Sequence, residues 1–216
     1  MCGGSLAQER DLSRLLLVRH GTTDFNTGRR FMGQSDIELS DEGYWQAEKL
    51  RDYLAREKID AAYSSDLRRA LVTAEVICQE RGLEIVTCPE LRECDYGECE
   101  GLTFGEIGSS YPEVAARCIN FTLDLEFPGG ECYRDFFERT GRFLERLDSY
   151  KPEKTVLVVA HDGVLKALLC TMLGIDGSHW WQLRLDTASL SIMETHPRGA
   201  RLTRLNDVCH LAADTD

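Results

Sequence analysis

Residues 15–28 read LLLVRHGTTDFNTG, an apolar run that ends in an arginine, a histidine and a glycine. A short, unbroken apolar run bounded by polar residues is typical of a buried strand, which we expect at residues 14–20. The chain repeats this pattern in residues 155–163, which read TVLVVAHDG. Each of the two expected strands therefore carries a histidine, His20 or His161, at its carboxyl end.

The rest of the chain alternates between strand-like and helix-like segments. Helical spacing of apolar residues recurs between the apolar runs. The expected strands are residues 14–20, 59–65, 85–88, 155–160, 188–195 and 201–205, and the expected helices lie at 40–54, 67–78, near 103–106, 136–147 and 164–172. This alternation predicts an α/β fold with three layers, α/β/α, in which helices cover both faces of a mostly parallel sheet. Ligands of such sheets bind beyond the carboxyl ends of the strands, where Arg19, His20 and His161 are expected.

We expect one domain, residues 14–210, because the chain shows no internal repeat, low-complexity tract or linker. Residues 1–13 are expected to be a disordered lead-in, and residues 211–216 a tail. Residues 109–131 contain two prolines and two consecutive glycines, so we expect them to be irregular. Because a long insertion of this kind often covers a site, a small lid is expected at about residues 105–133.

The charge and the apolar content limit the possible partners. The chain has 216 residues and a formal net charge of -12, which repels nucleic acids and anionic membranes. No apolar run approaches the roughly 20 residues of a membrane span. The first residues lack the basic and then apolar order of a secretory signal. We therefore expect a cytoplasmic protein that binds neither nucleic acid nor membrane.

The nine cysteines are odd in number and include no Cys-x-x-Cys pair. This usage is typical of reduced thiols in the cytosol. Cys94, Cys99 and Cys132 are the candidates for a metal site, but no paired ligand spacing accompanies them. We therefore expect no metal.

Positive and imidazole groups gather at three of the expected strand-to-helix junctions. The first junction holds Arg19 and His20, the second holds Arg69 beside the arginine at position 68, and the third holds His161. In an acidic protein, this concentration of positive charge indicates an anionic substrate, and a phosphate monoester fits best. Of the two neighbouring arginines, Arg68 is expected to be a solvated helix residue.

The chemistry of a phosphate monoester assigns different tasks to these residue types. A neutral imidazole is a competent nucleophile toward phosphorus, and arginines neutralise and orient the transferring phosphoryl group. The leaving oxygen needs a proton, which a carboxyl group with a raised pKa can supply. The acidic segment PELRECDYGECEG offers Glu93, Asp95 and Glu98 as proton donors.

The motif VRHGTTDFN resembles the signature of the histidine phosphatase superfamily, in its phosphoglycerate mutase-like branch. The similarity continues, in the family's order, through the motifs GQSDIELSDEGYWQA, YSSDLRRALVTAE, LRECDYGECEGLT, FPGGECYRDFFER and VVAHDGVLKALL. The motifs span about residues 15–205. The resemblance implies a phosphoglycerate mutase-like fold and a reaction that needs neither metal nor another cofactor.

The resemblance also implies roles for individual residues. His20 matches the nucleophile that becomes phosphorylated, and Glu93 matches the general acid and base. Arg19, Arg69 and Asn26 match the groups that hold the phosphate. The second histidine, at position 161, matches the residue that contacts the phosphate and stabilises the transition state.

Three features distinguish the sequence from parts of the family. Cys132 stands where many relatives have serine, Asp162 stands where many have glycine or asparagine, and both are expected near the substrate. The long insertion of cofactor-dependent phosphoglycerate mutases is absent, which favours a phosphatase. Among phosphatases the sequence resembles the α-ribazole phosphatases and the broad small-molecule phosphatases, so α-ribazole 5'-phosphate is one candidate substrate.

Two alternatives stay open at this point. The first is a mutase, which returns the phosphoryl group to a sugar acid. The second is a catalytically inactive phosphate-binding protein. In each case we expect a small phosphate ester as the partner and a monomer or homodimer as the assembly.

Overall fold

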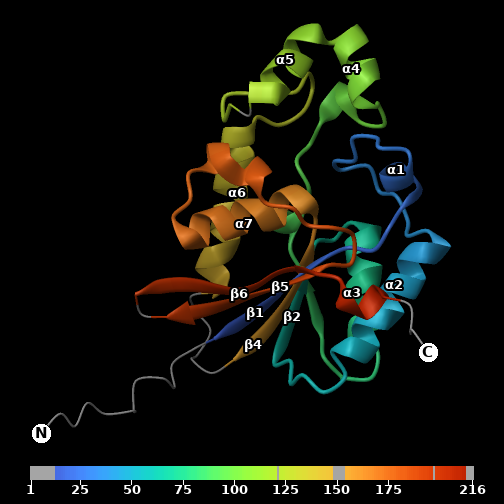
Figure 1. The fold of residues 1–216 in the computed structure, drawn as a ribbon, viewed down its shortest axis with the longest axis vertical. Coiled ribbons are helices and arrows are strands. Elements are labelled where there is room, and N and C mark those ends of the chain that lie inside the picture. Colours follow the sequence, from blue (N-terminus) through green and yellow to red (C-terminus); the bar gives the residue numbers. More distant parts are fainter. Residues whose placement is uncertain (1–12, 121, 148–153, 197, 213–216) are drawn as a thin grey trace, which may run out of the picture.

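The computed structural model describes residues 13–120, 122–147, 154–196 and 198–212 (Figure 1). Its sheet has six strands, which are listed here in chain order. They are β1 (Arg14–Arg19), β2 (Ala61–Ser64), β3 (Ile85–Thr87), β4 (Thr155–Ala160), β5 (Leu190–His196) and β6 (Gly199–Asp207). Each of them falls on a segment whose apolar pattern predicts a strand.

The helices between the strands are mostly amphipathic. They are α1 (Asp24–Thr27), α2 (Asp41–Tyr53), α3 (Arg68–Cys78), α4 (Phe104–Ser110), α5 (Pro112–Asn120), α6 (Tyr133–Leu147) and α7 (Asp162–Leu173). Short 3-10 helices lie at Pro89–Leu91, Gly97–Cys99, Gly177–Gln182 and Cys209–Leu211. Ser40 caps α2 by accepting a hydrogen bond from the main chain of Gly43, as the sequence predicts.

The strands lie in the order β3-β2-β4-β1-β5-β6. The pairs β2–β3, β2–β4 and β1–β4 are parallel, whereas β5 pairs antiparallel with both β1 and β6. The register places Arg19 of β1 beside Ala160 of β4. The residues that follow these two strands, His20 and His161, are therefore neighbours at one edge of the sheet.

Both faces of the sheet are buried, which explains the unbroken apolar runs. Leu15 and Leu17 of β1 pack in one hydrophobic cluster together with α6 and α7. The alternate residues Leu16 and Val18 pack in a second cluster with α2 and α3. Figure 1 shows these two helix pairs on opposite sides of the sheet. The α/β/α fold with a mostly parallel sheet is confirmed.

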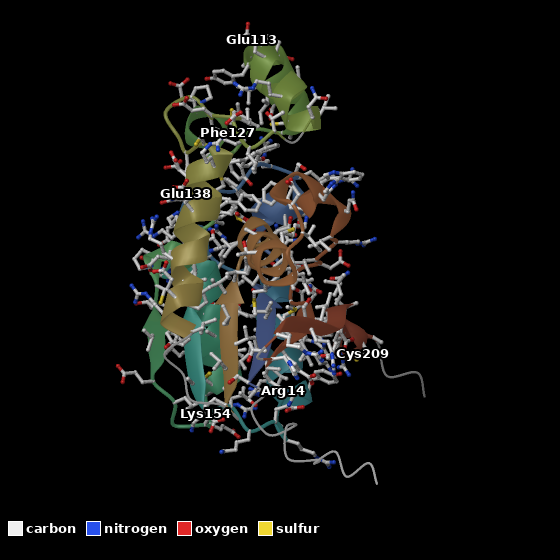
Figure 2. All side chains as sticks on the ribbon, turned by 90° about the vertical axis from the view of Figure 1, so that its left-hand side faces the viewer. Arg14, Glu113, Phe127, Glu138, Lys154 and Cys209 are labelled. Atoms are coloured by element: carbon white, nitrogen blue, oxygen red, sulfur yellow. The ribbon has the colours of Figure 1, made fainter. Side chains whose placement is uncertain are left out.

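The amino ends of β1 and β4 and the helix α5 lie at opposite ends of the molecule (Figure 2). Arg14 and Lys154, near the amino ends of β1 and β4, lie at one end, and Glu113 of α5 lies at the other. Helices α4 and α5, residues 104–120, extend from the body above the carboxyl ends of the parallel strands (Figure 1). We call these two helices the protrusion.

The expectation that residues 109–131 are irregular is wrong, because α5 runs from Pro112 to Asn120. A proline is tolerated at the first position of a helix, where its missing N–H needs no partner. The apolar side of α5 buries Ala115 and Cys118. After α5, an antiparallel bridge joins Glu126 to Cys132.

Within the described residues, no helix is long and apolar enough to cross a membrane. Residues 1–12 of the expected lead-in and residues 213–216 of the expected tail lie outside the described part of the chain.

Candidate active site

The two histidines predicted at the strand ends lie against each other. The ring centroids of His20 and His161 are 5.1 Å apart in an edge-on arrangement, and each residue is 1% exposed. The main-chain N–H of His20 donates to the carbonyl of Ala160, which extends the pairing of β1 and β4 by one bond. The sheet itself therefore fixes the distance between the two imidazoles.

A hydrogen bond fixes the tautomer of His20. Its Nδ1 lies 2.7 Å from the carbonyl oxygen of Gly21, which can only accept. Nδ1 therefore carries the proton, and Nε2 keeps its lone pair. Gly21 has to be glycine here, because a Cβ at this position would lie 2.5 Å from the carbonyl oxygen of Gly43 at the start of α2.

His161 is held by the end of the neighbouring strand. Its Nε2 lies 2.9 Å from Oγ of Ser65, the residue after β2. Ser65 Oγ also accepts a hydrogen bond from the main chain of Leu67, so its own hydrogen is available to His161. No local sequence pattern marks Ser65 as a site residue, because its role depends on the pairing of β2 with β4.

Burial keeps both imidazoles neutral. It is the largest cause that lowers the pKa of His20 well below 6.5, and the charges of Arg69 and Arg19 lower it further. The pKa of His161 is also lowered well below 6.5, again mainly by burial and then by Arg69. A neutral His20 with a lone pair on Nε2 is the form that can attack phosphorus.

The two arginines approach the histidines from different elements. Arg19, at the end of β1, donates from Nη1 to the carbonyl of Leu185. Arg69, on α3, is fully buried and donates from its two Nη atoms to the carbonyls of Ser35 and Gly33, at 2.8 and 2.6 Å. Burial lowers the pKa of Arg69 to about 10, so its guanidinium stays charged at neutral pH.

Several buried nitrogen atoms at this place have no hydrogen-bond partner among the described residues. They are Nε of Arg19, Nε of Arg69 and Nδ1 of His161. Buried polar atoms are nearly always satisfied in folded proteins, so a group of unsatisfied ones around His20 needs an explanation. Bound anionic oxygens would satisfy the two guanidinium N–H groups.

Glu93 reaches the same place from the loop after β3. Its Oε1 accepts from the main-chain N–H of Cys94 at 2.9 Å, and its Oε2 accepts from that of Gly163 at 3.0 Å. The side chain is almost fully buried, and burial is the largest cause that raises its pKa above 4.5. A carboxyl group with a raised pKa can hold the proton that a general acid has to give.

Arg139 of α6 holds the loop that carries Glu93. Its guanidinium forms two 2.9 Å hydrogen bonds to the carboxylate of Glu131. It also donates to the main-chain carbonyls of Glu90 and Arg92 at 2.8 Å and of Glu93 at 3.2 Å. No local sequence pattern marks Arg139, because its partners are mostly main-chain atoms of a distant segment.

A cavity of about 200 Å³, here called the site cavity, opens beside His20. Its lining residues are Arg19, His20, Asn26, Arg30, Phe31, Met32, Glu93, Tyr96 and Asp162. The structure thus brings four predicted site residues to one cavity, with His161 packed against His20 and Arg69 buried nearby. The aromatic and sulfur-containing walls were not predicted.

Asn26 is oriented by the cap of α1. Its Oδ1 accepts from the main-chain N–H and the hydroxyl of Thr23, both at 3.0 Å. Since the carbonyl side of the amide is occupied, the amide NH₂ is the group that can donate to an anion in the site cavity. The four-residue helix α1 was not predicted, because it is too short to show a periodic pattern.

The two departures from the family pattern lie in different places. Asp162 lines the site cavity, where its carboxylate is 3.7 Å from Arg19 and 2.7 Å from Lys166. Cys132 instead accepts a weak hydrogen bond from the main chain of Asp135 at the start of α6. It is not among the residues that line the site cavity.

The alternative proton donors and the alternative arginine lie elsewhere. Asp95 accepts from the main chain of Gly97, and Glu98 accepts from the hydroxyl of Tyr111, so neither lines the site cavity. Arg68 is exposed and pairs with a glutamate on the surface, as predicted. Within the described part of the chain, no group of three or more His, Cys, Asp or Glu side chains could hold a metal ion.

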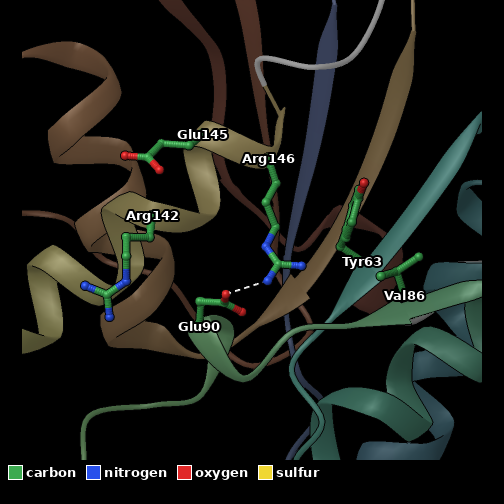
Figure 3. Close-up of a pocket in the computed structure, with 6 residues that line it drawn as sticks. All are labelled: Tyr63, Val86, Glu90, Arg142, Glu145 and Arg146. Carbon is green, nitrogen blue, oxygen red and sulfur yellow. Dashed lines mark hydrogen bonds and ion pairs between the residues drawn. The ribbon is translucent and has the colours of Figure 1, made fainter.

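A larger cavity, about 550 Å³, lies beside α6 and the β2–β3 edge of the sheet (Figure 3). Its lining residues are Tyr63, Val86, Glu90, Arg142, Glu145 and Arg146. Arg146 and Glu90 form an ion pair across it at 2.6 Å. It contains no histidine and none of the predicted site residues, so we place the chemistry in the smaller site cavity.

Known proteins resemble this chain along most of its length. The sequence model of the histidine phosphatase superfamily (branch 1) matches residues 15–208. Phosphoserine phosphatase 1 of Hydrogenobacter thermophilus is 35% identical over 198 residues, which are 92% of this chain and 94% of the relative. The metal-independent phosphoserine phosphatase of Arabidopsis thaliana is 30% identical over 208 residues, 95% of this chain and 86% of the relative. The crystal structure of the alpha-ribazole phosphatase from Shigella flexneri matches with a TM-score of 0.84 and 30% identity, covering 90% of this chain and 96% of that one.

Proposed function

Because this chain belongs to branch 1 of the histidine phosphatase superfamily and is a phosphomonoesterase, we propose that it hydrolyses small-molecule phosphate esters through a phosphohistidine on His20. One observation supports this mechanism above the others. His20 presents an unprotonated Nε2 beside a group of unsatisfied buried nitrogen atoms on Arg19, Arg69 and His161. This arrangement provides a nucleophile and an anion-binding environment together.

In the first step, the lone pair on His20 Nε2 attacks phosphorus. The bond between phosphorus and the ester oxygen breaks, and Glu93 gives its proton to that oxygen. The free alcohol leaves, and the phosphoryl group stays on Nε2. Arg19, Arg69 and the amide of Asn26 are proposed to hold the phosphoryl oxygens during this transfer.

In the second step, water attacks the phosphoryl group. Glu93, now a carboxylate, takes a proton from this water, and the bond between phosphorus and Nε2 breaks. Inorganic phosphate leaves, while the electron pair returns to Nε2 of His20. His161 is proposed to donate from its ring to a phosphoryl oxygen in both steps, since burial keeps it neutral.

The positive charge that a metal ion often supplies to phosphoryl transfer can come here from the two guanidinium groups. We therefore propose a metal-independent reaction. The relative from Arabidopsis thaliana is named a metal-independent phosphoserine phosphatase, which supports this proposal.

The substrate is proposed to be α-ribazole 5'-phosphate or another small phosphate monoester. The alpha-ribazole phosphatase of Shigella flexneri supports the first choice, and the phosphoserine phosphatases support phosphoserine as its main competitor. A cytoplasmic location and a monomeric or homodimeric state are further parts of the proposal.

The test is phosphate release from a panel of esters that includes α-ribazole 5'-phosphate, phosphoserine and the phosphoglycerates. We expect release that is insensitive to a chelator and that disappears in a folded His20→Ala variant. Interconversion of phosphoglycerates without phosphate release would instead indicate a mutase. Phosphate release by His20→Ala above a hundredth of the wild-type rate would refute the phosphohistidine mechanism.

A further inference from the structure

A third cavity, of about 360 Å³, lies under the protrusion and is here called the apolar cavity. Its lining residues are Phe31, Phe104, Cys118, Ile119 and Tyr133. None of these side chains is charged at neutral pH, since burial raises the pKa of the Cys118 thiol to about 11 and raises the pKa of Tyr133 well above 10. The cavity therefore offers an uncharged, largely apolar surface.

The apolar cavity adjoins the site cavity. Phe31 lines both of them. Its ring lies 5.1 Å from the ring of Tyr96 in the site cavity, and both rings pack on Phe127. Phe127 in turn lies 5.5 Å from Tyr133 of the apolar cavity. One aromatic cluster therefore contributes to the lining of both the site cavity and the apolar cavity.

The protrusion presents large apolar side chains to solvent at this cavity. Phe104 is 44% exposed and Ile119 is 66% exposed, although both stand on helices with buried apolar sides. A group of exposed apolar residues at a concave place is typical of a binding surface. Its position next to the site cavity indicates that the occupant is attached to the phosphate.

Two charged side chains that line the site cavity, Arg30 and Asp162, form ion pairs within the protein. Arg30 forms an ion pair with Glu106 at 3.1 Å and donates to the carbonyl of Gly101 at 2.7 Å. Asp162 pairs with Arg19 and with Lys166. In the apolar cavity, whose lining side chains carry no charge, an ammonium or carboxylate on the alcohol part of a substrate would lose water without gaining a partner of opposite charge.

We propose that the apolar cavity binds the alcohol part of the substrate, and that this part is an uncharged aromatic group. The inference rests on the proposed phosphatase function and narrows its substrate class. Aryl or aryl-bearing phosphates are then preferred over phosphoserine and the phosphoglycerates. Phe104 and Ile119 act as specificity residues and have no part in the transfer of the phosphoryl group.

The test compares 1-naphthyl phosphate with phenyl phosphate, whose leaving groups have similar acidity, and with phosphoserine. The second ring of the naphthyl group reports apolar contact, so we expect kcat/KM to be at least about tenfold higher than for phenyl phosphate. We expect a still larger preference over phosphoserine. Equal kcat/KM for the two aryl phosphates, or a higher value for phosphoserine, would overturn the inference.

Two variants locate the effect. Phe104→Ser and Ile119→Ser should each reduce the naphthyl preference severalfold and leave phenyl phosphate turnover nearly unchanged. Ile175→Ser is the matched control, because Ile175 is 37% exposed and lies outside the apolar cavity. A naphthyl preference that survives both cavity variants would also overturn the inference.

The outcomes separate this inference from the proposed function. If phosphoserine is hydrolysed best and His20→Ala is inactive, the proposed mechanism holds and the aromatic substrate class is wrong. If His20→Ala hydrolyses every ester as fast as the wild type, the proposed mechanism itself is wrong, and the aromatic substrate class that rests on it falls with it.

Discussion

Gly163→Ala should disable proton transfer by Glu93 while leaving the fold intact. Gly163 is the second residue of α7, and its N–H donates to Oε2 of Glu93 at 3.0 Å. A Cβ at this position would lie 2.4 Å from Oε1 of Glu93 and 3.2 Å from Cζ3 of Trp180. Neither neighbour can yield easily, because both side chains are buried.

The size of the effect follows from this geometry. Ordinary contacts of a Cβ atom begin at 3.4 Å, so the carboxylate has to move by roughly 1 Å. A displacement of about 1 Å at a reacting group costs about 100-fold in rate, or about 2.7 kcal/mol of activation free energy. The free energy of unfolding should change little, since alanine favours a helix over glycine by about 1 kcal/mol and offsets part of the strain.

The assay is kcat/KM for two substrates that differ in leaving group. An alkyl phosphate needs a proton on its leaving oxygen, so its turnover should fall about 100-fold. Turnover of p-nitrophenyl phosphate should fall much less, because p-nitrophenolate leaves without a proton. Gly141→Ala is the control, since a Cβ at Gly141 of α6 would meet open space. It should leave both rates unchanged and stabilise the fold by about 0.5–1 kcal/mol.

A folded Gly163→Ala variant with wild-type turnover of the alkyl phosphate would refute this reasoning. The carboxylate of Glu93 would then have no role that depends on its position. An equal loss on both substrates would also contradict it, because it would indicate damage to the phosphate site instead of the acid.

Four further predictions concern the same site. Glu93→Gln should reduce turnover of alkyl phosphates by about 10²- to 10⁴-fold and that of p-nitrophenyl phosphate much less, and equal losses would exclude Glu93 as the acid. Arg139→Lys should reduce turnover of alkyl phosphates roughly tenfold and that of p-nitrophenyl phosphate much less, because one ammonium cannot replace the several hydrogen bonds that hold the Glu93 loop. An equal loss on both substrates together with a lowered Tm would mean that Arg139 has only a structural role. Turnover of the dianionic form of the substrate should not change as the pH falls past 6.5, because the pKa of His20 is lowered and its neutral form persists. A fall in this turnover centred at pH 6.5 would contradict the prediction. Turnover should fall at alkaline pH as the Glu93 carboxyl group, whose pKa is raised, loses its proton. This fall should disappear in Glu93→Gln.

The strand ends could be predicted from the sequence because two physical patterns agree there. The apolar runs before His20 and His161 are unbroken, which requires burial on both faces of a parallel sheet. Parallel strands with adjacent register place their carboxyl ends together, so the histidines had to meet. The choice of Arg69 over Arg68 rests on the family resemblance, and the structure agrees with it, because Arg69 is fully buried whereas Arg68, the preceding residue of α3, is exposed.

Other parts of the site depend on contacts that no local pattern records. Arg139 acts through main-chain carbonyls of residues 90–93, and any sequence offers such carbonyls. The apolar cavity joins Phe31 to residues of α4 and α5 that lie more than seventy positions later in the chain. A proline also favours irregular structure when only the sequence is considered, whereas Pro112 stands at the first position of α5, where a helix accepts proline.

The central claim is the phosphoryl group on His20, and trapping it is the most direct test. The wild-type protein is mixed with p-nitrophenyl phosphate, quenched in base within the first turnover, digested and examined by mass spectrometry. The account predicts a base-stable phosphoryl group on Nε2 of His20, because Nδ1 is occupied by its hydrogen bond to Gly21. A phosphoryl group on another residue, or unmodified His20 during a burst of p-nitrophenolate, would contradict it.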